Sequence, residues 1–71
     1  MEKVHVQIIA FDKNSNENTG RNIVADSKES FNEQVEEFEN EVPYTKFYVE
    51  MIADEVLSDE QLEIVSDHDV N

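Results

Sequence analysis

The chain of 71 residues is short and strongly acidic, since eighteen Asp and Glu against five Lys and Arg give a formal net charge of −13. Such a surface repels phosphate, which argues against direct binding to nucleic acid or to an anionic membrane and favours a basic partner. The lack of Cys excludes a disulfide framework, and the single Gly leaves no phosphate-binding glycine loop.

The distribution of apolar residues bears on the cellular location of the protein, and its short length bears on its stability. No apolar run approaches the roughly 18–20 residues of a membrane span, and residues 1–13 lack the basic-then-apolar build of a signal peptide, so we expect a cytoplasmic protein. We expect one acidic domain over residues 1–71, with 67–71 as a frayed tail. A core of this size rarely contributes more than about 3–5 kcal/mol of net stability.

Residues 4–11 alternate between two faces, which is the period-2 pattern of a β-strand. The more apolar face consists of Val4, Val6, Ile8 and Ala10. The polar, Asn-rich segment 12–21 contains the only Gly and predicts a long mobile connection. Residues 22–26 predict a short second strand, paired with the first as a hairpin.

An apolar stripe at helical spacing runs through residues 31–42 and predicts the main helix. The stripe consists of Phe31, Val35, Phe38 and Val42. Its N-cap is Asp26 or Ser27, or else Ser30 in a capping box with Glu33. Pro43 ends the helix, because proline disfavours helical geometry at the preceding residue.

Residues 45–51 alternate again and are rich in aromatic side chains, which predicts a third strand with Phe47 in the core. Ser58 and Gln61 form a capping-box pattern that predicts a short helix over 59–65, with a fourth strand at 62–65 as the alternative. The predicted fold is α+β: a small antiparallel or mixed three-stranded sheet in β-β-α-β order, with the main helix packed on it.

Enzymatic chemistry finds little support in the sequence. His5 belongs to the less apolar face of the first strand and His68 to the terminal tail, and neither lies in a pattern typical of an oriented catalytic base. Residues 67–69 are of types that can ligate a metal ion. The sequence has no calcium-binding loop, however, so we expect no specific metal site and no cofactor. We therefore expect a protein that is not an enzyme.

The charges of the main helix are the feature that points to a function. With 100° per residue, Glu29, Glu33, Glu36 and Glu37 lie about 140–240° from Phe31, on the side away from the apolar stripe. Glu29, Glu33, Glu37 and Glu41 also form an i, i+4 row, and its three like-charge pairs cost the helix about 1 kcal/mol at low salt. In so small a protein, this row is better explained by a partner than by helix formation.

The second half of the chain extends this acidic character, because residues 47–71 contain eight Asp and Glu but neither Lys nor Arg. Regularly spaced carboxylates imitate the phosphates of a DNA strand. We therefore expect the protein to mimic DNA and to occupy the basic cleft of a nucleic-acid-binding protein. The expected partner-binding residues are Glu29, Glu33, Glu36, Glu37 and Glu41, supported by Glu50, Asp54, Glu55, Asp59, Glu60 and Glu63.

In composition and in its glutamate-rich helix, the chain resembles the small phage-encoded DNA mimics that inhibit restriction enzymes, CRISPR nucleases or DNA repair enzymes. The resemblance implies a nuclease, repair enzyme or polymerase of a bacterial host as the partner, and it transfers no individual residues. Two alternatives stay open. One is an immunity-type or regulatory protein that binds a basic enzyme surface through a few hot-spot contacts such as Tyr48, and the other is a plain acidic adaptor. Homodimer formation is open as well.

Overall fold

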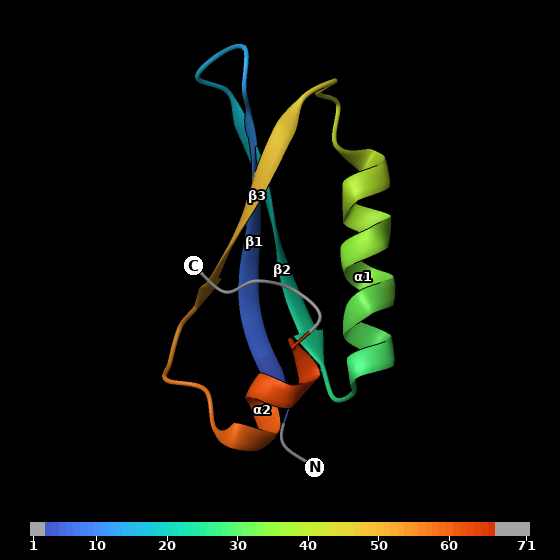
Figure 1. Ribbon diagram of the computed structural model, residues 1–71, viewed down its shortest axis with the longest axis vertical. Helices are drawn as coiled ribbons and strands as arrows, with labels where there is room; N and C mark the ends of the chain where they lie inside the picture. Colours follow the sequence, from blue (N-terminus) through green and yellow to red (C-terminus); the bar gives the residue numbers. More distant parts are fainter. Residues whose placement is uncertain (1–2, 67–71) are drawn as a thin grey trace.

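The computed structural model describes residues 3–66, which form three strands and two helices (Figure 1). In chain order these are β1 (Val4–Asp12), β2 (Asn18–Ala25), α1 (Lys28–Glu41), β3 (Phe47–Ala53) and α2 (Asp59–Ile64). The predicted α+β fold in β-β-α-β order is confirmed, and a short helix follows the third strand. The predicted frayed tail lies outside the described residues, and so does the 67–69 segment with His68.

The sheet has the order β2-β1-β3, with β1 in the centre and antiparallel to both neighbours. In the two registers, Val6 lies opposite Ile23 of β2 and opposite Ala53 of β3. The two outer strands therefore run parallel to each other on either side of β1. Strands in this arrangement need a crossover connection, and α1 provides it.

The hydrophobic core lies between α1 and one face of the sheet. The alternating apolar residues of β1 point to this face, and Phe31 of α1, which is fully buried, packs among them. Ile64 and Val65 at the end of α2 close the core at its lower end in Figure 1. Phe47, which was predicted to lie in the core, packs against the core but is only partly buried. These contacts fix the side of α1 that remains in solvent.

The hairpin differs from the sequence-based prediction. The expected long connection over 12–21 is in fact the five residues 13–17, because β1 runs to Asp12 and β2 begins at Asn18. The sequence predicts a second strand that begins at residue 22, whereas β2 already begins at Asn18. The reason is physical: the early part of β2 places polar residues on the solvent-facing side, so its sequence lacks the apolar alternation that reveals a strand.

Capping residues set where both helices begin. Ser27 is the N-cap of α1, and its hydroxyl accepts a hydrogen bond from the Ser30 amide at 3.1 Å. Of the three alternatives from the sequence, the structure therefore selects Ser27. In α2, Ser58 and Gln61 form the predicted capping box, and the short helix rather than a fourth strand is present.

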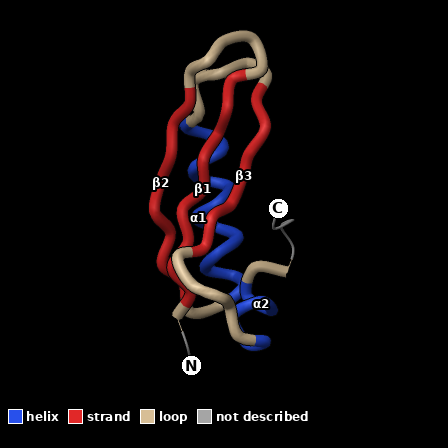
Figure 2. The backbone as a smooth tube through the Cα atoms, turned by 90° about the vertical axis from the view of Figure 1, so that its left-hand side faces the viewer, coloured by secondary structure: helices blue, strands red, loops and turns tan. Residues whose placement is uncertain are grey.

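The opposite face of the sheet is not covered by either helix (Figure 2). It consists of the alternate positions of the strands, and it exposes Val24, Tyr48 and Ile52 to 46%, 49% and 46%. The Tyr48 ring stacks on Phe11 of β1, with 5.1 Å between the ring centroids. We call this surface the open face.

Candidate protein-interaction surface

Four glutamates form a compact acidic array on the outer side of α1. Phe31, Val35 and Phe38 are buried against the sheet, so helical geometry turns the intervening carboxylates outward. The array consists of Glu29, Glu33, Glu36 and Glu37, all of which are exposed. They extend along about 12 Å of the helix axis, so one negative charge falls every ~4 Å. We refer to these four residues as the α1 array.

Glu41 has a different environment from the other predicted residues of α1. Its carboxylate accepts a hydrogen bond from the Arg21 guanidinium of β2 and forms an ion pair with it. The same guanidinium lies over the Phe38 ring, 5.6 Å from the centroid. Glu41 is thus partly neutralised and held against the sheet, and it is a weaker candidate for contact with a partner than the α1 array.

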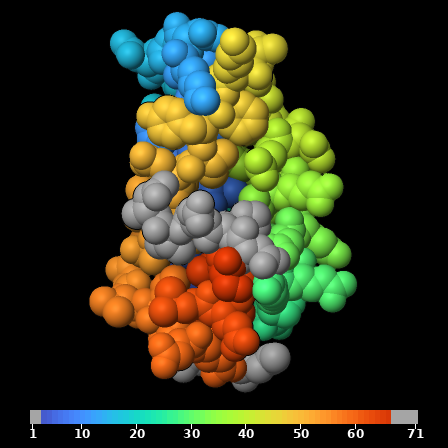
Figure 3. Space-filling view, viewed as in Figure 1, coloured from blue at the N-terminus to red at the C-terminus, as the bar shows by residue number. Residues whose placement is uncertain are grey.

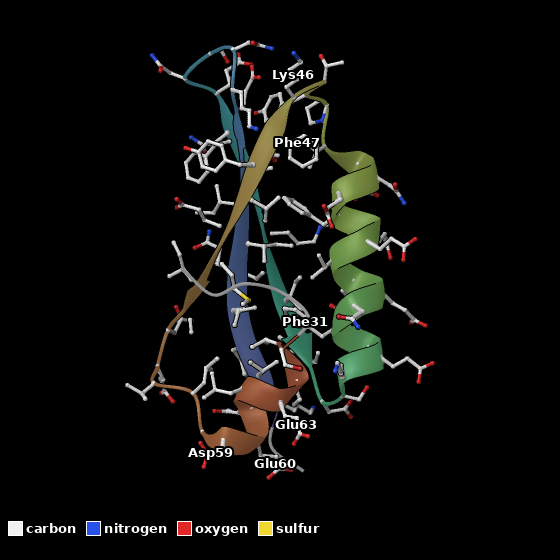
Figure 4. The ribbon with its side chains drawn as sticks, viewed as in Figure 1. Phe31, Lys46, Phe47, Asp59, Glu60 and Glu63 are labelled. Carbon is white, nitrogen blue, oxygen red and sulfur yellow. The ribbon has the colours of Figure 1, made fainter. Side chains whose placement is uncertain are left out.

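The acids of α2 adjoin the beginning of α1 at the lower end of the molecule (Figures 3 and 4). Glu60 and Glu63 line a shallow groove together with Asp26, Ser27 and Lys28. Lys28 therefore lies where the acidic surfaces of the two helices meet. Asp59, in the first turn of α2, is exposed at the same end.

The remaining predicted acids lie on another side of the molecule. Glu50 of β3 is opposite Ile9, so its side chain belongs to the open face, away from α1. Asp54 and Glu55 follow β3 and line a depression with His5, which is also on the open-face side. The structure thus places Glu60 and Glu63 beside residues 26–28, just before the α1 array begins, and it separates Glu50, Asp54 and Glu55 from both groups.

Two positions bear on catalytic or metal chemistry. His5 is exposed and lines an open depression with Asp54 and Glu55. Partial desolvation, together with the negative charges of Glu17 and Asp12, raises the pKa of the Tyr44 phenol above its ordinary value, which does not favour Tyr44 as a general base. Within residues 3–66, no group of three or more His, Asp and Glu side chains is arranged to hold a metal ion.

Two features of the surface were missed by the sequence analysis. Arg21 was assigned to a mobile connection, although its spacing from Ile23 and Ala25 places it on the core side of a longer strand. The exposed open face was missed because Val24 and Ile52 are apolar strand residues, which a pattern cannot assign to a solvated face. The alternation of Tyr48 with Phe47 was the signal that could have revealed it.

A comparison with protein-family models, curated proteins and solved structures found no match to this chain. Neither helix within residues 3–66 has the length and apolar character needed to cross a membrane.

Proposed function

We propose that this protein is a non-enzymatic inhibitor that imitates DNA and occupies the basic nucleic-acid-binding cleft of a partner protein. The observation that carries the proposal is the exposed α1 array. Its mean spacing of ~4 Å along the α-helix axis is close to the roughly 3.4 Å of duplex axis that each phosphate of one DNA strand occupies. A cleft built to hold phosphates would accept such a row of carboxylates, and the occupied cleft would no longer bind DNA.

The positions of the acidic residues reduce the number of them that we expect to contact the partner. Glu60 and Glu63 extend the acidic surface beyond the α1 array at its N-terminal end, with Lys28 between the two groups. Glu41 contributes less, because Arg21 neutralises part of its charge. Glu50, Asp54 and Glu55 act at long range, through the overall negative field that steers association. Asp59 lies at the edge of the contact.

A second candidate function has a specific observation in its favour. Tyr48 is 49% exposed and stacks on Phe11, and an exposed aromatic pair of this kind is typical of interface hot spots. A regulator that binds a basic enzyme through this pair would lose most of its affinity in the single substitution Tyr48→Ala. A DNA mimic would instead lose little from any one substitution and much from several glutamate substitutions together.

The test uses the immobilised full chain to capture proteins from a bacterial lysate at low salt, with elution by competing duplex DNA. The captured protein is purified, and its DNA binding is measured with increasing amounts of three versions of the chain. The first is the wild type. The second is the triple variant E33Q/E36Q/E37Q, which removes three charges from the α1 array. The matched control, E17Q/D54N/E55Q, removes three charges elsewhere.

The wild type and the control should displace DNA, and the α1 variant should need at least about tenfold higher concentration, because it loses three phosphate-like contacts. Equal inhibition by both triple variants would mean that only total charge matters, as for a plain acidic adaptor. Binding that persists unchanged from about 50 mM to about 500 mM NaCl would contradict the electrostatic mimic.

A further inference from the structure

The outer edge of β3 is the least protected part of the sheet. β3 hydrogen-bonds with β1 on one side, and within residues 3–66 no strand pairs with its other side. Its sequence, FYVEMIA, is apolar except for Glu50. Natural sheets normally protect such an edge with charges, proline, a bulge or a covering element, because an exposed apolar edge pairs readily with another strand.

The other edge strand, β2, differs from β3 in its polarity and in its partial cover. β2 is more polar, since it contains Arg21 and places three Asn or Gly residues on its solvent face. Part of its outer edge is also covered, because the Gln34 side chain of α1 donates a hydrogen bond to the Val24 carbonyl at 3.0 Å. The two edges are therefore not equivalent, and only the β3 edge combines apolar composition with uncovered backbone groups in the part of the chain that the structure describes.

The direction of the backbone groups of β3 follows from one hydrogen bond. The Lys13 amide donates to the Lys46 carbonyl at 3.0 Å, which continues the β1–β3 ladder by one step before β3. In an antiparallel strand the amide and carbonyl of one residue point to the same side, and the side alternates. Tyr48 and Glu50 therefore bond toward β1, whereas Phe47 and Val49 direct their backbone groups to the free edge.

Charge selects the partner for this edge. Lys46 and Glu50 lie at equivalent positions of the alternation, two residues on either side of Tyr48, and neither has an ion-pair partner within residues 3–66. Lys46 is instead opposite Lys13, which directly follows β1. A second copy of β3 in antiparallel orientation, with Tyr48 opposite Tyr48, places each Lys46 opposite the Glu50 of the other copy. Pairing centred on Glu50 would instead place two carboxylates in contact.

We propose that the free edge of β3 binds β3 of a second copy of this chain around a two-fold axis at Tyr48. Phe47 of each copy exchanges backbone hydrogen bonds with Val49 of the other. The Tyr48 pair is then the closely spaced, non-hydrogen-bonded pair, with about 4.5 Å between Cα atoms, so the two rings meet on the open face. Lys46 and Glu50 form two equivalent cross-strand ion pairs.

The resulting dimer has one continuous six-stranded sheet. A two-fold axis perpendicular to the sheet keeps both α1 helices on the same side, and it joins the two open faces on the other side. The contact uses the half of β3 that lies away from α2, which is at the opposite end of the molecule (Figure 1). The proposal is independent of the proposed inhibitory function, since it rests on β3 and not on the α1 array.

The test is the association state of the full chain by sedimentation equilibrium, from about 10 µM to about 1 mM. The wild type should form a dimer. K46E and E50K should each weaken dimerisation by at least about tenfold, because each turns two attractive pairs into two repulsive pairs. An equimolar mixture of the two variants should form a heterodimer with near wild-type affinity, since the carboxylates of one variant then face the ammonium groups of the other.

Val49→Pro provides a second test that does not depend on charge. It removes an amide that points to the free edge and is not used within the chain, so it should abolish the dimer, and circular dichroism checks that the fold is kept. A wild type that stays monomeric up to about 1 mM would overturn the proposal. So would a dimer that K46E and E50K leave unchanged, or a mixture of these variants that fails to associate.

Discussion

At the scale of single residues, Arg21 makes the most instructive set of contacts. Its guanidinium pairs with Glu41 and lies over Phe38, so one cation links β2 to the C-terminal half of α1. The pair is partly exposed, with 37% and 55% of the two side chains accessible, and solvent screening reduces its contribution. The ring contact and the apolar stem of Arg21 are therefore expected to matter as much as the charge.

Arg21→Ala should accordingly destabilise the protein more than Glu41→Gln. We expect about 1–2 kcal/mol for R21A, which loses the ion pair and the aromatic contact, and at most about 1 kcal/mol for E41Q. Urea unfolding at low salt and at high salt measures the free energy of unfolding of both variants. Salt should reduce the effect of E41Q, whereas most of the R21A effect should remain; equal losses would show that Phe38 contributes nothing.

Phe31 is the residue on which the core depends most directly. It is fully buried between α1 and the sheet, and Phe-to-Ala changes in such positions cost about 3–5 kcal/mol. That is comparable to the whole net stability of a domain of this size, so F31A should be largely unfolded by circular dichroism. Val56→Ala is the control, because Val56 is 98% exposed and its truncation should change the free energy of unfolding by less than about 0.5 kcal/mol.

At the scale of elements, α1 contains a charge conflict that the Arg21 contact only partly relieves. With Glu41 paired, two like-charge i, i+4 pairs remain in the glutamate row, and both include Glu33. Glu33→Gln should therefore raise the free energy of unfolding by about 0.4–1 kcal/mol at low salt. The gain should disappear at about 0.5 M NaCl, where charges on the surface are screened.

The matched control for this prediction is Glu55→Gln, which removes the same charge from an exposed position outside both helices. Urea titrations of the two variants at both salt concentrations separate local repulsion in α1 from the effect of total charge. If E55Q stabilised the protein as much as E33Q, the row itself would carry no energetic cost.

The short helix α2 depends on its capping box more than a long helix would. The Ser58 hydroxyl accepts from the Gln61 amide at 3.2 Å, and the Gln61 side chain donates in turn to the Lys3 carbonyl at 2.9 Å. Ser58→Ala should cost about 0.5–2 kcal/mol in urea unfolding. Ser66→Ala serves as a control, because its hydroxyl only donates to the Glu63 carbonyl at the exposed end of the helix.

Most elements could be predicted because their patterns are local. The helix stripe around Phe31 and the box at Ser58 each follow from residues a few positions apart, and both are present. The start of β2 could not be predicted, since Asn18 lies opposite Phe11 in the register of β1 and β2 but its side chain gives no apolar signal. Backbone pairing of polar residues leaves no periodicity in the sequence.

At the scale of the whole molecule, the candidate site could be predicted only in part. The outward direction of the α1 array follows from helical periodicity alone. The position of Glu50 on the open face depends on which face of β3 packs against α1, and the pairing of Glu41 depends on a residue twenty positions away. Contacts between elements thus decide which acids share a surface.

The net charge of −13 leads to a kinetic prediction for the proposed partner complex. Electrostatic steering should make association fast at low salt, and the association rate constant should fall by at least about tenfold between about 50 mM and 500 mM NaCl. Stopped-flow measurements with the captured DNA-binding protein test this. An association rate that does not depend on salt would indicate that the charge serves solubility and not recognition.

The central position of β1 also has a consequence for the order of folding. Of the three strands, β1 is synthesised first and both later strands pair with it, and its second neighbour, β3, begins only at Phe47. We therefore expect the hairpin of β1 and β2 to form early in the nascent chain, with one side of β1 waiting for β3. Until β3 has paired, one edge of β1 remains open, and unpaired strand edges make folding intermediates prone to aggregation.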